Sequence, residues 1–261
     1  MPTTSLHTVT VEGIGPVPVT LTARGEGRPI LLLHGGMGPQ SVTVFADLLA
    51  GNVPVCVLTP VHPGFGGAPR PERLNSVAGL AALYVALLEQ LDLTEVTVIG
   101  NSIGGWITAE IAVLGSARVR DVVLVNAVGI DVPDHPPANF FGLTPEEAAA
   151  HAYHNPAAFR VDPDTLTSEQ LAAMAASREA LGVYGAGMTD PGLIARLSTI
   201  TVPATVIWGE SDRIVTPDYG RAYAAAIPGA RFELLPATGH APQIESPALL
   251  FDALQGLNIP A

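Results

Sequence analysis

Short apolar runs rich in β-branched residues alternate along the chain with longer runs rich in alanine and leucine. Eight of the short runs predict β-strands, at residues 8–11, 17–23, 30–33, 53–59, 96–100, 122–125, 205–208 and 232–235. The later runs are too uniformly apolar for strands with one face in water, so helices should cover both faces of the sheet. The alternation predicts an α/β fold with a mostly parallel eight-stranded sheet, entered through an antiparallel hairpin at residues 13–16.

Four of the longer runs predict helices that flank this sheet. Residues 74–91 have an amphipathic pattern, and residues 103–114 are apolar on nearly every side, which is typical of a buried helix. Residues 218–226 and 247–254 predict surface helices.

The stretch from residue 129 to 197 interrupts the alternation. It has no convincing strand pattern and is crowded with proline, alanine, histidine and aromatic residues. No repeat or low-complexity linker marks it as a separately folding domain. We expect residues 129–197 to form a small helical cap inserted after the sixth strand, over the carboxyl edge of a core made of residues 1–128 and 198–261.

Two helices are predicted inside this stretch. Thr144 and Glu147 have the spacing of a capping box, and Pro145 occupies the first helical position. These residues predict a helix at 144–151, and a second helix is expected at 168–180.

Composition narrows the class of partner. The 261 residues carry 12 basic and 24 acidic side chains, and the formal net charge of −12 repels phosphate backbones and anionic lipids. We therefore expect no nucleic-acid partner and no membrane partner. All the basic residues are arginine, and the absence of lysine excludes a Schiff-base enzyme and a P-loop.

From the hydropathy pattern we expect no membrane-spanning segment and no signal peptide. No apolar stretch reaches the roughly 18 to 20 residues of a membrane-spanning helix, and the first residues lack the basic head and apolar run of a signal peptide. These features predict a cytoplasmic protein. The lone Cys56 lies in an apolar run, so we expect a buried thiol and neither a disulfide nor a metal ligand.

The first candidate for chemistry is a serine between a predicted strand and a predicted helix. The run Gly100-Asn-Ser-Ile-Gly-Gly105 contains Gly-x-Ser-x-Gly in a strand–turn–helix context, which is far rarer than the five letters alone. Glycine at positions 100 and 104 leaves room for a sharp turn that exposes the hydroxyl above the amino end of the helix. Ser102 is therefore the predicted nucleophile.

A serine hydroxyl needs a base to remove its proton and a third group to orient that base. Asp212 and His240 each follow a predicted strand, so both would lie near Ser102 at the carboxyl edge of the sheet. We predict that His240 is the base and Asp212 the orienting acid. Other candidates for the acid are Asp131, after the preceding strand, and the local residues Glu210 and Asp218.

A tetrahedral intermediate also needs backbone donors for its oxyanion. The amide of Ile103, directly after the nucleophile, is one candidate. The second is expected from the glycine-rich loop after the third strand, where we favour the amide of Gly36 over that of Met37. His34 in the same loop is expected to hold the loop in place, because the role of base is already filled.

These motifs together resemble those of α/β-hydrolase fold serine hydrolases. The His-Gly-Gly oxyanion loop, the Gly-Asn-Ser-Ile-Gly-Gly elbow, the Gly-Glu-Ser-Asp acid turn and the Gly-His-Ala-Pro histidine turn span nearly the whole chain. The resemblance implies that residues 129–197 correspond to the cap domain that shapes the pocket in such enzymes. A serine in place of aspartate at the elbow disfavours the haloalkane dehalogenase and epoxide hydrolase branches.

The elbow is also similar to that of carbon–carbon bond hydrolases acting on ring-cleavage products. The resemblance implies a tryptophan directly after the catalytic histidine of those enzymes, where this chain has Ala241. This departure places carbon–carbon cleavage second among the candidate reactions.

The predicted function is hydrolysis of a small, partly hydrophobic carboxylic ester or lactone through an acyl-enzyme, without cofactor or metal. The alternatives are a carbon–carbon bond hydrolase, a ligand receptor on the same fold, and a cofactor-free oxygen enzyme. The expected partner is a small molecule, and a homodimer is left open. Candidate substrate-binding residues are Gly35, Trp106, Phe140, Phe141 and Tyr184, although the aromatic residues of the insertion also suit a core inside the cap.

Overall fold

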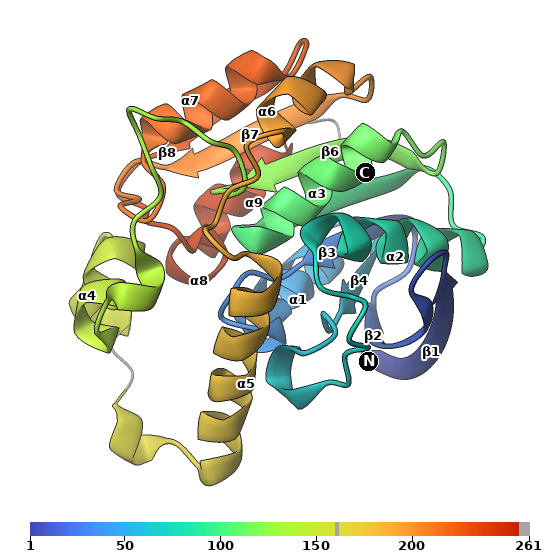
Figure 1. Cartoon of the computed structure of the whole chain (residues 1–261), viewed down its shortest axis with the longest axis horizontal. Helices are drawn as coiled ribbons and strands as arrows, with labels where there is room; N and C mark the ends of the chain where they lie inside the picture. The colour runs from blue at the N-terminus through green and yellow to red at the C-terminus, as the bar shows by residue number, and fades with distance from the viewer. Residues whose placement is uncertain (160–161, 256–261) are drawn as a thin grey trace.

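The computed structural model describes residues 1–159 and 162–255 of the chain. Eight strands form one sheet in the order β1-β2-β4-β3-β5-β6-β7-β8 (Figure 1). Their bounds are β1 Thr3–Val11, β2 Gly15–Arg24, β3 Arg28–Leu33, β4 Val55–Pro60, β5 Val96–Asn101, β6 Val119–Val125, β7 Ala204–Gly209 and β8 Arg231–Leu235. β2 pairs antiparallel with β1 and β4, and the remaining neighbours are parallel, so the predicted hairpin and mostly parallel sheet are confirmed.

The α-helices of the described residues are α1 Thr43–Asn52, α2 Val77–Gln90, α3 Ile103–Leu114, α4 Pro145–Ala152, α5 Ser168–Tyr184, α6 Leu193–Arg196, α7 Pro217–Ala226, α8 Pro242–Glu245 and α9 Pro247–Gln255. The helix predicted at 74–91 begins later than expected, because the Ser76 side chain caps it by accepting a hydrogen bond from the Gly79 amide. α1 is absent from the predicted helices. Residues 160–161 of the predicted insertion and 256–261 of the predicted core lie outside the described part of the chain.

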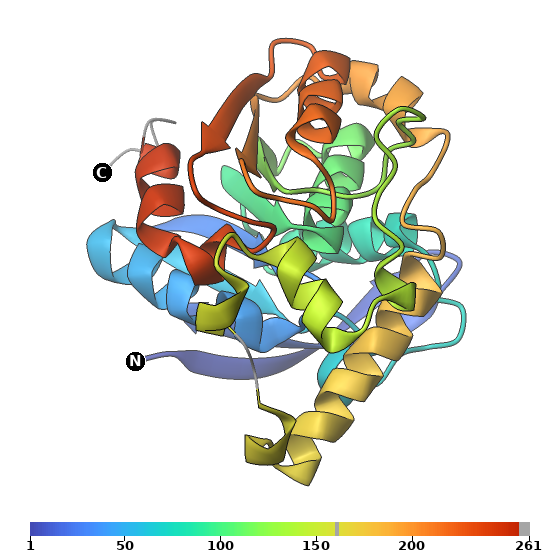
Figure 2. The same cartoon turned by 90° about the vertical axis from the view of Figure 1, so that its left-hand side faces the viewer.

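The sheet separates two hydrophobic cores. In β7, Val206 and Trp208 pack into the core beneath α2, α3 and α7, whereas Ile207 between them packs into the core beneath α1 and α9. Figures 1 and 2 show these two groups of helices on opposite faces of the sheet. Because both faces are covered, the strands are apolar at consecutive positions, as the sequence pattern predicts.

The carboxyl ends of the parallel strands lie level at one edge of the sheet. The register pairs at these ends are Leu33 with Gly100, Asn101 with Val125, and Gly209 with Leu235. The loops that follow β3, β5, β7 and β8 carry the residues predicted to perform chemistry. β5 lies between β3 and β6, so the serine turn that follows it occupies the middle of this edge.

The described part of the connection from β6 to β7 contains α4, α5, α6 and short 3-10 turns joined by irregular segments, with one isolated bridge between Gly129 and Thr189. The capping box predicted at Thr144 forms and starts α4, while α5 runs four residues farther than predicted, to Tyr184. In Figures 1 and 2, α4 and α5 lie outside the layered core, and α5 projects away from it.

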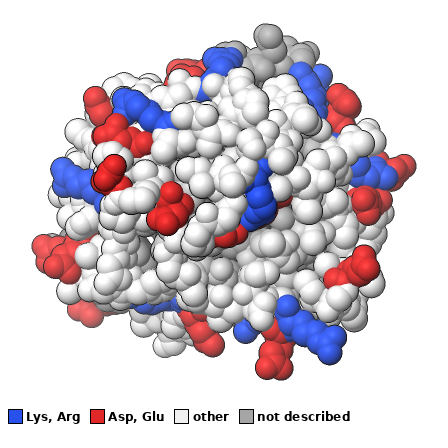
Figure 3. All heavy atoms as spheres, turned by 45° about the horizontal axis from the view of Figure 1, so that its top comes forward, with Lys and Arg blue, Asp and Glu red and all other residues white. Residues whose placement is uncertain are grey.

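Within residues 1–159 and 162–255, no helix combines the length and the apolar character needed to cross a membrane. On the face drawn in Figure 3, acidic and basic side chains are interspersed among uncharged ones and no large patch of one sign is seen. Exposed ion pairs such as Arg221 with Asp218, 2.9 Å apart, contribute at most about 1 kcal/mol to stability.

Candidate active site

Ser102 lies on a sharp turn between β5 and α3. Its φ and ψ angles of 58° and −119° are rare for a residue with a side chain. The turn is closed by hydrogen bonds from the Ser102 amide to the carbonyl of Val125, 3.0 Å, and from the Trp106 amide to the carbonyl of Ser102, 3.1 Å. A Cβ on Gly100 would lie 2.0 Å from the carbonyl oxygen of Gly104, so only glycine fits there. The glycines of the motif are therefore required by the close backbone contacts that the sequence predicts at this turn.

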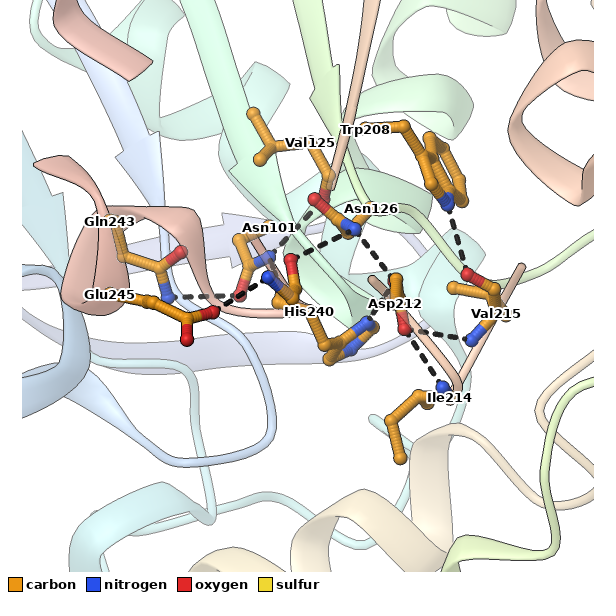
Figure 4. Close-up of polar contacts among 11 residues, drawn as sticks. Asn101, Val125, Asn126, Trp208, Asp212, Ile214, Val215, His240, Gln243 and Glu245 are labelled. Atoms are coloured by element: carbon orange, nitrogen blue, oxygen red, sulfur yellow. Dashed lines mark hydrogen bonds and ion pairs between the residues drawn. The ribbon is translucent and has the colours of Figure 1, made fainter. Parts of the chain in front are cut away.

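Asp212 lies in the loop after β7, and its hydrogen bonds fix the carboxylate in one orientation (Figure 4). Oδ1 accepts hydrogen bonds from the amides of Ile214, 2.8 Å, and Val215, 3.1 Å. Oδ2 accepts one from Nδ2 of Asn126, 2.6 Å, and lies 2.8 Å from Nδ1 of His240. The side chain is fully buried, so this carboxylate is held by neighbours and not by water.

His240 lies in the loop after β8 and is held through its backbone as well as its ring. The His240 amide donates to the carbonyl of Ala152, 2.7 Å, and its carbonyl accepts from Nδ2 of Asn101, 2.9 Å. Asn101 directly precedes Ser102, so the same bond connects the histidine loop to the serine turn. With Nδ1–H directed at Asp212, the other ring nitrogen, Nε2, is left with a free lone pair that can accept a proton.

The loop after β3 lies directly against the serine turn. A Cβ on Gly35 would lie 3.2 Å from the Cβ of Ser102, and one on Gly36 would lie 2.9 Å from Cδ2 of Leu181 in α5. The insertion therefore covers the loop that the sequence predicts as an oxyanion donor. The Met37 side chain is 45% exposed and contacts the Tyr153 hydroxyl of the insertion at 3.5 Å. The amides of Gly36, Met37 and Ile103 remain predicted donors.

Two buried histidines support the loop after β3, and their hydrogen bonds define both tautomers. Nε2 of His34 accepts from the His62 amide, 3.2 Å, so Nδ1 carries the proton and donates to the Gly35 carbonyl, 2.8 Å. Nε2 of His62 donates to the His34 carbonyl, 3.0 Å, so its Nδ1 accepts from the Tyr84 hydroxyl. Burial lowers the pKa of His34 from 6.5 to about 4 and lowers the pKa of His62 well below its ordinary value. Both rings are therefore neutral near pH 7 and serve as fixed supports.

The aromatic residues predicted as pocket candidates lie in different places. The Tyr184 ring stacks on Phe65 with centroids 6.3 Å apart, and its hydroxyl donates to the carbonyl of Pro63, 3.0 Å. Phe141 is exposed, whereas Phe140 is partly buried against the main hydrophobic core, and the guanidinium of Arg178 is 5.6 Å from each ring centroid.

Trp106 lies in the first turn of α3, and its ring packs against Gly129 where the insertion begins. Its buried indole N–H has no hydrogen-bond partner among the described residues. Of the pocket candidates, Gly35 lies against the side chain of Ser102, and Trp106 contacts Ser102 through its backbone amide.

Two polar residues that contact the predicted site are missing from the sequence prediction. Asn126, directly after β6, donates to Asp212, and Gln243 donates from Nε2 to Oδ1 of Asn101, 3.1 Å. The signal for Asn126 was a polar residue at the end of a buried strand, and Gln243 has no comparable sequence signal. Asp131, the more distant candidate acid, is exposed, and the carboxylate that faces His240 is Asp212.

A sequence model described as the alpha/beta hydrolase family matches residues 30–253 of this chain. A 2-hydroxy-6-oxononadienedioate/2-hydroxy-6-oxononatrienedioate hydrolase of Cupriavidus pinatubonensis is 28% identical over 244 residues, which cover 85% of this chain and 83% of that protein. A 2-hydroxymuconate semialdehyde hydrolase of Pseudomonas putida is 28% identical over 239 residues, covering 85% and 84%. The structure of an esterase from Thermogutta terrifontis is similar with a TM-score of 0.79 and 22% identity, over 97% of both chains.

Proposed function

The chain belongs to the alpha/beta hydrolase family, and from this premise we propose that it cleaves a small, partly hydrophobic carboxylic ester or lactone through an acyl-enzyme on Ser102. The observation that carries the proposal is the 2.8 Å contact between Nδ1 of His240 and Oδ2 of Asp212, in a histidine loop that is hydrogen-bonded to Asn101, the residue before Ser102. A carboxylate and an imidazole paired in this way would activate a serine hydroxyl for acyl transfer.

In the proposed reaction, Nε2 of His240 takes the proton of Ser102 while Oγ attacks the carbonyl carbon. Asp212 keeps the imidazole in the required tautomer and stabilises the imidazolium that forms. The amides of Gly36 and Ile103 donate to the oxyanion, and each donor is expected to lower the barrier by about 2.7–4 kcal/mol. His240 then gives its proton to the leaving alcohol, and water activated by the same ring hydrolyses the acyl-enzyme. Apart from the substrate and water, every group in this proposed reaction belongs to the chain itself, so the mechanism requires no cofactor.

The surroundings of the serine favour a small and weakly charged substrate. Ser102 and His240 are only 7% and 8% exposed, and the apolar side chain of Leu181 lies over Gly36. The carboxylate of Asp212 is paired with His240, so it is not free to bind a cationic substrate. The overall charge of −12 opposes anionic polymers. These features support an ester or lactone with a short apolar acyl group.

Carbon–carbon bond hydrolysis is the second candidate, because the 2-hydroxy-6-oxononadienedioate hydrolase and the 2-hydroxymuconate semialdehyde hydrolase each match 85% of the chain. The Gly-Asn-Ser elbow, in which Asn101 binds the histidine loop, also supports this reading. Against it, Ala241 occupies the position where the resemblance implies tryptophan, and this alanine is fully buried.

The first test is intact mass after exposure to a fluorophosphonate, with the Ser102→Ala protein as its control. A single adduct on the natural chain that is absent from the variant would support the nucleophile, and no adduct on folded protein would overturn the proposal. Multiple turnovers on short-chain p-nitrophenyl esters or lactones would then support ester hydrolysis. Faster turnover of a 2-hydroxy-6-oxo-dienoate would favour the second candidate, and tight binding without turnover would favour a receptor.

A further inference from the structure

One carboxylate outside the predicted triad receives three backbone amides from two separate segments. Oε2 of Glu245, at the end of α8, accepts from the Gly239 amide, 2.6 Å, and from the His154 amide, 3.1 Å. Oε1 accepts from the Asn155 amide, 3.0 Å. Gly239 directly precedes His240, whereas His154 and Asn155 follow α4 in the insertion. Glu245 therefore joins the histidine loop to the insertion, and Figure 4 shows it beside His240.

Further hydrogen bonds connect the same part of the insertion to the acid and histidine loops. The carbonyl of His151 accepts from the amide of Arg213, 3.0 Å, directly after Asp212. Nδ1 of His154 lies 2.7 Å from Oγ of Ser211, directly before Asp212. Together with the bond from the His240 amide to the Ala152 carbonyl, these contacts tie residues 151–155 to both loops.

The fit between the segments is too close for a side chain at position 239. A Cβ on Gly239 would lie 2.2 Å from the carbonyl oxygen of Ala152 and 2.7 Å from Cα of Tyr153. The insertion backbone thus lies directly on the residue before the base. A carboxylate is suited to this junction because its two oxygens only accept hydrogen bonds, and all three groups that face it are donors.

We propose that Glu245 is a positioning residue, which fixes His240 by holding Gly239 and residues 154–155 on one carboxylate. The proposal rests on the proposed function, since it assigns His240 the role of base. Residues 151–155 then form a fixed wall of the site and stay on the base while substrate enters, because lifting them would break the contacts to both loops. Reactivity of Ser102 then depends on Glu245, although the carboxylate of Glu245 is bound to backbone amides and not to the serine or the ring of His240.

The test compares Glu245→Ala and Glu245→Gln with the natural chain. Glu147→Ala is the matched control, because Glu147 also accepts a backbone amide of the insertion, that of Thr144 at 2.8 Å, but at the far end of α4. Two quantities are measured for each folded variant. One is the maximal rate of fluorophosphonate labelling with the reagent concentration at half-maximal rate, and the other is hydrogen exchange of the amides at 154, 155 and 239.

We expect Glu245→Ala to lower the maximal labelling rate by about 10- to 100-fold, with the half-saturating concentration nearly unchanged, because a misplaced base slows the chemical step. Exchange should accelerate in both segments at once. The labelling rate of Glu245→Gln should lie between those of Glu245→Ala and the natural chain, since one acceptor oxygen remains while the amide NH₂ faces donors. Glu147→Ala should label at the natural rate.

Labelling of Glu245→Ala at the natural rate would overturn the proposal, and so would an equal slowing in Glu147→Ala, which would indicate general destabilisation of the insertion. Failure to label the natural chain would overturn the proposed function instead. In that case hydrogen exchange alone tests whether Glu245 holds the two segments together. Loss of protection in both segments of Glu245→Gln would support this role, and unchanged protection would reject it.

Discussion

Nδ2 of Asn126 donates to Oδ2 of Asp212 over 2.6 Å, and this is the oxygen that faces Nδ1 of His240. Asn126 has a φ of 47°, a left-handed conformation that asparagine tolerates better than most residues. Its own amide donates to the carbonyl of Ile207 in β7, 3.0 Å. Asn126 therefore holds the carboxylate from a neighbouring strand, in addition to the two amides of the acid loop itself.

Replacing Asn126 should lower activity without removing any member of the proposed triad. Asn126→Asp exchanges a donor for a second carboxylate beside Asp212, so both oxygen groups repel and the imidazole loses its fixed partner. We expect kcat to fall by about 10- to 100-fold with little change in KM. Asn126→Gly removes the donor but suits the positive φ, and it should show a smaller loss. Steady-state kinetics on an ester substrate measure both, and natural activity in Asn126→Asp would contradict the role of Asn126.

The acid of the proposed triad can be assigned by two matched substitutions. Asp212→Asn keeps the shape of the side chain but leaves His240 without the carboxylate that fixes its tautomer. The serine-protease example of this substitution loses a factor on the order of 10⁴ in kcat, and we expect a similar loss here. Asp131→Asn changes an exposed residue after β6 and should leave kcat within about twofold, as surface changes usually do. The opposite result would move the acid to Asp131.

The sheet could be predicted from the sequence because its buried strands are short, uniformly apolar and bounded by turn residues. α1 could not, because its cap position, Val42, makes no side-chain hydrogen bond and the run resembles neither an amphipathic helix nor a strand. The insertion helices α4 and α5 could be predicted from the polar residues that cap their amino ends, at Thr144 and before Ser168, more than from their apolar pattern.

Ser102, Asp212 and His240 could be selected from the sequence because each follows a strand, and parallel strands end at one edge. The groups around them could not be selected in this way. The contact of Asn126 with Asp212 depends on β6 lying beside β7, and that of Glu245 depends on where the insertion returns. Strand order and insertion path come from packing between distant segments, which spacing along the chain does not encode.

Removing the Ser102 hydroxyl should separate activity from stability. Ser102→Ala should abolish ester turnover and leave the thermal midpoint nearly unchanged, because the side chain contributes a hydroxyl and little packing. Ser102→Gly should be more stable than the alanine variant by about 1 kcal/mol, because a φ of 58° with a ψ of −119° strains any residue with a Cβ. Full turnover by either protein would reject the nucleophile, and a less stable glycine variant would reject the strain.

The buried pair of His34 and His62 predicts a loss of stability at mildly acidic pH. The folded pKa of His34 is about 4 and its ordinary value is 6.5, so between these values the unfolded chain binds a proton that the folded chain does not. Stability from this group is complete above pH 6.5 and is lost as the pH falls toward 4. His62, whose pKa is also lowered by burial, adds to the loss in the same direction.

The pH range of this loss of stability distinguishes it from ordinary acid denaturation. One histidine should lower the free energy of unfolding by about 2 kcal/mol between pH 6.5 and 5, a range that lies above the titration of ordinary carboxylates. Urea unfolding at several pH values measures the slope, with His135→Gln in the insertion as a control that should retain it. A flat free energy between pH 6.5 and 5 would contradict the neutral tautomers assigned to His34 and His62. In that case His34 would carry a proton on both ring nitrogens in the folded chain, and the hydrogen bond that its Nε2 accepts from the His62 amide could not form.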